Sequence, residues 1–261
     1  MTELPHHLDR TVLIRAAPEI VFRFFTDSAR WATWWGAGST IDAKPGGKVY
    51  IRHPNGVESL GEVLEVVLPE RIVFTYGFAS GQPIPPGSSR VTIRLEPEEA
   101  GTRLSLRHEF AEAGPRDHHV QGWRFQLSLF SNAVANEIYA DAADAVDVWF
   151  GAWAIADDRL REETLAKIVT PGIRFCDRFS VLDGLVDLTA HTGAAQRFMP
   201  GIRMQRKGEV RQCQGTALAD WIAVDSDRKE LMSGTNVFVF RADRRIDAVT
   251  GFSNPAAART S

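Results

Sequence analysis

The amino-acid sequence predicts a mixed α+β protein with two successive domains. In the first half, several short runs of alternating polar and apolar residues are followed by one long amphipathic helix. In the second half the order is reversed, with helical patterns first and strand-like runs last, which is typical of a separate α+β unit. The length of 261 residues accommodates two ordinary domains, which we expect to span residues 1–140 and 141–261.

Turn residues and periodicity predict the elements of the first half. A strand-like run over residues 9–15 precedes Pro18, which is well tolerated at the start of a helix. Trp31, Trp34 and Trp35 lie at positions i, i+3 and i+4, on one face of a second short helix. Strand-like runs follow at about 49–53, 59–68, 71–78, 88–96 and 102–110, and the turn Pro54-Asn55-Gly56 separates the first two.

The alternation within these runs indicates an antiparallel sheet with one buried and one solvated face. Leu104, Leu106 and His108 share one face, whereas the residues between them are polar. A helix over residues 121–138 can cover the buried face, because its large apolar side chains recur every three or four residues. These side chains are Trp123, Leu127, Phe130, Val134 and Ile138.

The second half begins with helices and ends with a meander of strands. A helix carrying Trp149 and Trp153 on one face is followed by a charged helix over 159–168. Thr170-Pro171-Gly172 is expected to stop that helix before a short strand through Phe175. A helix near 184–197 precedes three strand-like runs, at about 202–206 continuing through 209–224, at 230–241 and at 245–252.

Composition and missing motifs exclude several functional classes. The formal charge of −3 lacks the basic excess that a nucleic-acid-binding protein needs. No apolar run is long enough to span a membrane, no signal peptide is recognisable, and two cysteines cannot form a disulfide framework. Phosphate-binding loops, nucleophile elbows and metal-binding motifs are also missing, and His118-His119 has no third ligand at a recognisable spacing. We therefore expect a cytoplasmic protein with no cofactor and no metal, and a homodimer remains open.

An ordered set of short motifs runs through the first half. It comprises Pro18–Phe25, Trp34-Trp35-Gly36, Pro45-Gly46-Gly47-Lys48, Pro54-Asn55-Gly56, Gly61 with Glu65-Val66, Pro69-Glu70-Arg71, and His119 with Gly122-Trp123 and Leu127. In this order the motifs resemble the START-like SRPBCC superfamily, specifically its branch named after the activator of the heat-shock-protein-90 ATPase. The resemblance covers about residues 8–138. It implies a helix-grip domain, in which a curved antiparallel sheet wraps around the C-terminal helix and encloses an apolar cavity.

The second half is similar to the SnoaL-like group of the nuclear-transport-factor-2-like superfamily, over about residues 142–253. The supporting stretches are the Trp149–Trp153 helix, Phe175-Cys176-Asp177, Asp183-Gly184-Leu185 and Gly234–Phe240. This resemblance implies a cone-shaped α+β domain, in which helices close the sheet around a second apolar pocket.

Several aromatic and polar residues are candidates for contact with a ligand. In the first domain, Trp35 lies beside Gly36 at a helix end, and Tyr76 follows Ile72 and Phe74 with a period of two. His108 and Trp123 are predicted to face the cavity. In the second domain the candidates are Trp149, Trp153, Trp221 and Asn236. The alternative for the tryptophans is packing in the core, and for His108 it is a hydrogen bond to a neighbouring carbonyl group.

Asp177 is the candidate catalytic base. It lies where ketosteroid isomerase-type relatives carry a proton-shuttling aspartate, whose burial in an apolar pocket increases its basicity. The phenol expected on the first helix is replaced by Trp149 and Trp153, and an indole is a far weaker acid. His191 is a candidate partner of Asp177. The alternative is that Asp177 holds the loop leading to Ser180.

Three functions follow from these observations. The leading hypothesis is the binding of small apolar or amphipathic molecules in one or both cavities. The alternative is an isomerase, cyclase, hydratase or hydrolase that uses Asp177. The second alternative is a co-chaperone that activates an ATPase. We do not expect a chaperone partner, because the eukaryotic activators carry an additional N-terminal domain, whereas the START-like region here begins close to Met1.

Overall fold

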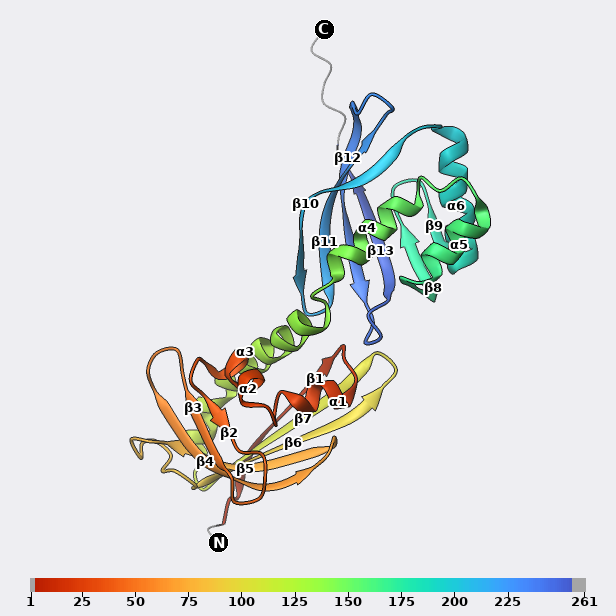
Figure 1. Ribbon diagram of the computed structural model, residues 1–261. Helices are drawn as coiled ribbons and strands as arrows, with labels where there is room; N and C mark the ends of the chain where they lie inside the picture. Colours follow the sequence, from red (N-terminus) through yellow and green to blue (C-terminus); the bar gives the residue numbers. More distant parts are fainter. Residues whose placement is uncertain (1–2, 255–261) are drawn as a thin grey trace. The chain divides into compact units, whose positions relative to one another are not determined.

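The computed structural model describes residues 3–254, which form two sheets and six helices (Figure 1). The mixed α+β fold class predicted from the sequence is therefore confirmed. By its internal contacts the chain divides into two compact units, Met1–Glu137 and Ile138–Ser261. Each unit has its own sheet and its own core, so the two are described separately.

The first unit contains a seven-stranded antiparallel sheet with the strand order β1-β7-β6-β5-β4-β3-β2. Its strands are β1 (His6–Ile14), β2 (Thr40–Ile41), β3 (Lys48–Arg52), β4 (Glu58–Val67), β5 (Arg71–Phe78), β6 (Ser89–Glu98) and β7 (Gly101–Phe110). Its helices are α1 (Pro18–Arg23), α2 (Ser28–Trp35) and α3 (Ala113–Ile138). The strands and helices expected in this half are all present, and the short strand β2 is additional.

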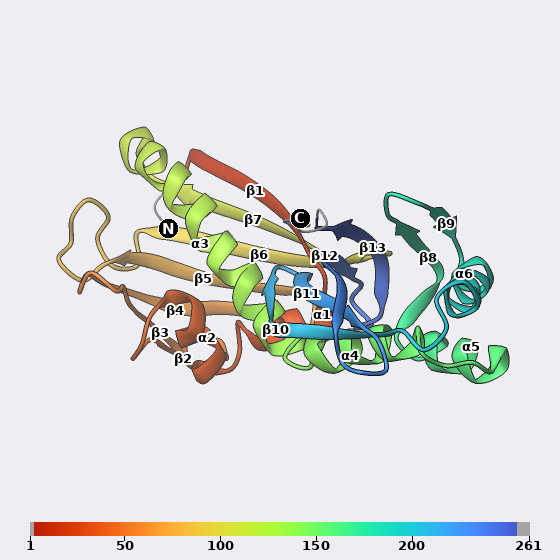
Figure 2. The same cartoon turned by 90° about the horizontal axis from the view of Figure 1, so that it is seen from above.

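Helix α3 runs across the sheet of the first unit, as Figure 2 shows. It starts at Ala113, several residues before the predicted start. The five apolar side chains predicted to cover the sheet are all buried. On the sheet, Leu104, Leu106 and His108 are at most 1% exposed, which confirms the predicted alternation on β7. A long helix over one face of an antiparallel sheet is the arrangement that the helix-grip resemblance implies.

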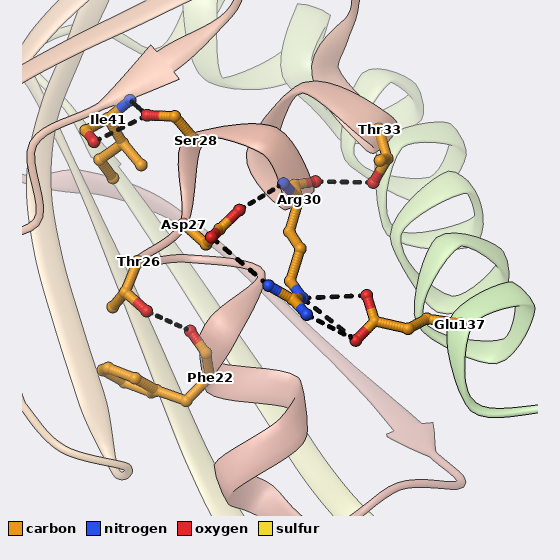
Figure 3. A network of polar contacts seen from close by, with 8 residues as sticks. All are labelled: Phe22, Thr26, Asp27, Ser28, Arg30, Thr33, Ile41 and Glu137. Atoms are coloured by element: carbon orange, nitrogen blue, oxygen red, sulfur yellow. Dashed lines mark hydrogen bonds and ion pairs between the residues drawn. The ribbon is translucent and has the colours of Figure 1, made fainter.

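Polar contacts fix helix α2 at its first turn (Figure 3). The Asp27 carboxylate accepts a hydrogen bond from the Arg30 backbone N–H at 2.9 Å and so caps the helix. The Arg30 guanidinium binds both carboxylate oxygens of Glu137, near the end of α3, at 2.9–3.1 Å. The Ser28 hydroxyl pairs with the backbone of Ile41 in β2 at 3.0 Å. These contacts position α2 against both α3 and the sheet.

The second unit contains a six-stranded sheet with the strand order β10-β11-β12-β13-β8-β9, in which only β13 and β8 pair in parallel. Its strands are β8 (Val169–Cys176), β9 (Val181–Asp183), β10 (Arg203–Cys213), β11 (Thr216–Val224), β12 (Glu230–Phe240) and β13 (Ile246–Ser253). Its helices are α4 (Ala142–Ala152), α5 (Asp158–Ala166) and α6 (Leu185–Phe198).

Two details of the second unit differ from the sequence-based expectation. The run expected to continue from 202–206 through 224 is a hairpin of β10 and β11. Gln214 and Gly215 at its tip have φ angles of 50° and 79°, as a tight two-residue hairpin turn requires. Pro171, predicted to stop a helix, lies inside β8, where the pairing with β13 shifts register between Val169 and Arg174. A proline is tolerated there because an irregular stretch needs no ladder hydrogen bond from its nitrogen.

A buried arginine joins the helices of the second unit. Arg161 in α5 is 1% exposed, and its guanidinium donates to the backbone carbonyl groups of Thr189 and Ile155 at 3.1 and 2.6 Å. It also pairs with Asp158. A Cβ atom on Gly193 of α6 would lie 2.1 Å from the Arg161 guanidinium, so a larger residue there would displace the guanidinium from its hydrogen bonds. None of the helices within residues 3–254 is long and apolar enough to cross a membrane.

Candidate functional site

The candidate site is a cavity of about 700 Å³ in the first unit, which we call the tryptophan pocket. It lies where the end of α2, the β3–β4 turn, the end of β5 and the N-terminal half of α3 meet. Most of its lining is apolar or aromatic. The lining residues are Thr33, Trp34, Trp35, Gly36, His53, Pro54, Asn55, Val57, Tyr76, Phe78, Pro83, His118, His119, Gly122, Trp123, Phe125, Gln126 and Leu129.

The position of Trp35 follows from the way α2 ends. Gly36 caps the helix with a φ angle of 140°, and a Cβ atom there would lie 2.2 Å from the Arg52 carbonyl oxygen. Only glycine allows this close approach to β3, so the helix stops with Trp35 beside the β3–β4 turn. Trp35 packs edge-on against Trp123 of α3 and His53 of the turn, with ring centroids 5.6 and 5.7 Å apart. The wall of the pocket is therefore built from three separate elements.

Trp35 differs from the other tryptophans of the first unit in its hydrogen bonding. The indole N–H groups of Trp31 and Trp34 donate to the backbone carbonyl groups of Tyr50 and Phe24 at 3.3 and 3.2 Å. The Trp35 N–H is buried and has no acceptor among the residues that the structure describes. A buried donor without a partner costs on the order of 1–3 kcal/mol, which a ligand carrying an acceptor would recover.

His108 lies behind the wall of the pocket and holds Trp123 in place. The Trp123 indole N–H donates to His108 Nδ1 at 2.9 Å, so the ring proton must lie on Nε2. Nε2 lies 2.9 Å from the Ser89 hydroxyl, which donates to the Tyr76 backbone carbonyl at 2.7 Å. Burial, followed by the proximity of His119, holds the pKa of His108 well below its usual value. His108 is therefore a neutral positioning residue that does not line the cavity.

Tyr76 places a phenolic hydroxyl in the pocket. The Ser59 hydroxyl donates to it at 3.0 Å, which leaves the phenolic proton available for an acceptor in the cavity. Burial raises the pKa of Tyr76 to about 12, so it remains protonated near neutral pH. His53 Nε2 lies 3.4 Å from the same Ser59 oxygen. The pKa of His53 is lowered by burial and by nearby His119.

His119 is a lining residue that the sequence suggested only as an unsupported metal ligand. Its Nδ1 lies 2.7 Å from the Pro115 carbonyl oxygen one helical turn earlier, so Nδ1 carries the proton and Nε2 is an acceptor. Burial lowers the pKa of His119, which favours the neutral ring. No group of three or more metal-binding side chains occurs within residues 3–254. The only sequence signal for His53 is its position directly before the Pro54-Asn55-Gly56 turn.

In the second unit, Trp149, Trp153 and His191 lie in one aromatic cluster. Trp149 and Trp153 both pack against Phe175 of β8, and Trp153 also contacts the His191 ring, with centroids 5.7 Å apart. The indole N–H groups of Trp149 and Trp153 are buried without an acceptor among the described residues. His191 Nδ1 lies 3.3 Å from the Ser180 hydroxyl.

Asp177 closes the turn between β8 and β9. Its Oδ1 atom accepts the backbone N–H groups of Phe179 and Ser180, each at 2.8 Å, which is an Asx turn. Asn236 and Trp221, the other two predicted residues, bond to one another, with the indole N–H donating to Asn236 Oδ1 at 2.9 Å. Both Asp177 and Asn236 flank Gly251, since a Cβ atom there would lie 3.4 Å from one side chain and 3.2 Å from the other.

Comparison with known proteins agrees with the resemblance seen in the first half of the sequence. Residues 15–135 match the sequence model of the family described as Activator of Hsp90 ATPase homolog 1-like protein. No curated protein matches the chain significantly.

Each of the similar solved structures covers about half of this chain. A SnoaL-like family structure from Agrobacterium tumefaciens is 22% identical, with a TM-score of 0.42, over 43% of this chain and 97% of that one. The solution structure of the Aha1 dimer from Colwellia psychrerythraea is 16% identical, with a TM-score of 0.44, over 49% and 96% of the two chains. A protein from Chromobacterium violaceum is 28% identical, with a TM-score of 0.42, over 50% and 97%. The chain thus carries an Activator of Hsp90 ATPase homolog 1-like region over residues 15–135, as the order of its motifs predicts.

Proposed function

We propose that this protein binds small apolar or amphipathic molecules, and that the tryptophan pocket of the first unit is the principal site. A cavity of about 700 Å³ is within the size range of pockets that hold small organic ligands. Exposed apolar side chains continue the lining to the surface, since Phe125 and Leu129 are 65% and 38% exposed. Such a surface favours an apolar ligand over water.

The observation that carries the proposal is the unpartnered Trp35 N–H in the wall of this cavity. Together with the phenolic proton of Tyr76 it provides two neutral hydrogen-bond donors in a site whose lining is mostly apolar or aromatic. His119 Nε2 adds an acceptor. A neutral ligand with a carbonyl oxygen on an apolar skeleton would satisfy these groups, whereas a fully ionised ligand would lose its hydration without a counter-charge.

The test is a fluorescence titration of the full chain with a neutral naphthylamine dye and with a panel of fatty-acid esters, steroids and aromatic polyketides. We expect saturable binding with a dissociation constant in the micromolar range. The Trp35→Phe variant keeps the aromatic wall but removes the N–H group. The affinity of this variant for carbonyl-bearing ligands should fall by up to about tenfold, which corresponds to the loss of one hydrogen bond. Its affinity for the dye should change little.

A matched variant in the second unit shows which pocket is used. Trp153→Phe removes the equivalent unpartnered N–H there and should leave binding in the tryptophan pocket unchanged. A loss of affinity in Trp153→Phe alone would move the site to the second unit. If no member of the panel changes the tryptophan emission or displaces the dye, the proposal is wrong.

The two alternatives have less support. An enzyme with Asp177 as its base needs a substrate at the carboxylate oxygen that the turn leaves free, and the Asx turn already accounts for this residue. The hypothesis of a chaperone partner is supported only by the description of the matching family. A pull-down with stoichiometric chaperone binding would favour that alternative over ligand binding.

A further inference from the structure

The outer face of the first sheet, opposite α3, carries a second hollow of about 650 Å³, which we call the arginine groove. Because successive side chains of a strand alternate between faces, the arginine and acidic side chains of β5, β6 and β7 lie on this side. Five arginines line the groove, against three carboxylates. The arginines are Arg10, Arg71, Arg90, Arg94 and Arg107.

The strand register brings like charges together in the middle of this groove. Arg94 of β6 pairs directly with Arg71 of β5, and on its other side it faces Ser105 of β7. Cations directly opposite one another on neighbouring strands repel and destabilise the sheet. An anion bound between the two side chains would relieve this repulsion.

The three carboxylates of the groove leave Arg94 without a counter-charge, since Glu65 pairs with Arg71. Glu109 is occupied by Arg90 through two hydrogen bonds of 2.8 Å. Asp9 reaches Arg107 only at 4.0 Å. Arg94 has no hydrogen bond and no ion pair with any residue that the structure describes, although it lines the groove.

Unused donors surround Arg94. Arg71 bonds to Glu65 through one terminal nitrogen, but its Nε is buried and has no acceptor among the described residues. The hydroxyl groups of Thr92 and Ser105 also line the groove and make no hydrogen bond within residues 3–254. Guanidinium groups with neighbouring hydroxyl donors match the oxygen geometry of phosphate and carboxylate groups.

We propose that the arginine groove is a binding site for the oxyanion group, phosphate or carboxylate, of a small polyanionic molecule. Arg94 binds the oxyanion directly, with Arg71 and Arg107 on either side. The site lies on the face of the sheet opposite the tryptophan pocket and is independent of it.

The test is calorimetric titration of the full chain with inorganic pyrophosphate and, separately, with citrate. We expect saturable binding of at least one probe, weakening as salt is added because the site is exposed. The Arg94→Gln variant should lose about tenfold or more in affinity, the effect of one charge-assisted hydrogen bond. Tighter binding of pyrophosphate would identify phosphoryl groups as the ligand chemistry, and tighter binding of citrate would identify carboxylates.

Two control variants make the result specific. Arg103→Gln changes an arginine on the same face of β7 that lies outside the groove and pairs with Glu98, and it should leave the affinity within about twofold. Trp35→Phe should leave the affinity for pyrophosphate and for citrate unchanged, because Trp35 lies in the other site. The proposal is overturned if neither probe binds saturably, if Arg94→Gln binds like the unmodified protein, or if Arg103→Gln loses as much affinity as Arg94→Gln.

Discussion

The buried His108 predicts that the first unit loses stability in mild acid. Its ring is fully buried and neutral, with Nδ1 accepting from Trp123 and Nε2 bonded to Ser89. The folded-state pKa lies well below the usual value, whereas in the unfolded chain it returns to about 6.5. Below that pH the unfolded state binds a proton that the folded state does not. The free energy of unfolding therefore falls as pH decreases from about 6.5 toward the folded-state pKa.

The size of the effect follows from one proton. If the folded ring stays neutral throughout, the contribution of His108 to the free energy of unfolding decreases by about 2 kcal/mol between pH 7 and pH 5. His53 and His119 have lowered pKa values for the same reason and add to this loss. The His108→Gln variant keeps a polar amide in the site but cannot titrate. The part of the stability loss in acid that comes from His108 should therefore disappear, and the part that comes from His53 and His119 should remain.

The assay is urea unfolding of the full chain between pH 5 and pH 8, followed by tryptophan fluorescence and circular dichroism. His108→Gln should be less stable at pH 7, yet its stability should depend less on pH, by about 2 kcal/mol over the range. Ser89→Ala is the matched control, because it breaks the same hydrogen-bond chain without removing a titrating group. It should lower the stability and keep the pH dependence. Equal pH dependence in His108→Gln and the unmodified protein would refute the reasoning.

Two further predictions concern the second unit, and both are measured by urea unfolding. Arg161→Met should lower the free energy of unfolding by about 3 kcal/mol, because it leaves buried carbonyl groups unpaired. The control is Arg159→Met, whose native side chain is 88% exposed, and it should change the free energy of unfolding by less than about 0.5 kcal/mol. Equal effects would contradict the role of the buried guanidinium. Gly234→Ala should cost about 2 kcal/mol, because the new methyl group would lie 2.1 Å from the Phe252 carbonyl oxygen and 2.5 Å from the Trp221 ring. Gly172→Ala, with open space around it, is the control; a stable Gly234→Ala protein would show that the Phe252 backbone and the Trp221 ring can both move at little cost.

The candidate site was predicted from the sequence only in part. Trp35, Tyr76 and Trp123 were selected by helix and strand periodicity, and all three line the tryptophan pocket. His108 was placed on the correct face of the sheet, but it lies behind Trp123 and does not reach the cavity. For His119 the sequence offers a place in the motif series and a metal-ligand type without partners, but it does not show that the neighbours of His119 are aromatic rings of β5 and β7.

The sequence by itself determined most of the order of elements, the buried face of β7 and the helix that covers the first sheet. These features depend on periodicity and turn chemistry, which act over a few neighbouring residues. The tertiary structure alone decided which polar atoms meet, such as the Trp123 N–H with His108 and the two arginines at positions 71 and 94. It also decided which atoms have no partner within residues 3–254, such as the Trp35 N–H. The reason is that hydrogen-bond partners here lie on separate elements, and strand register and helix placement are set by packing across the whole unit.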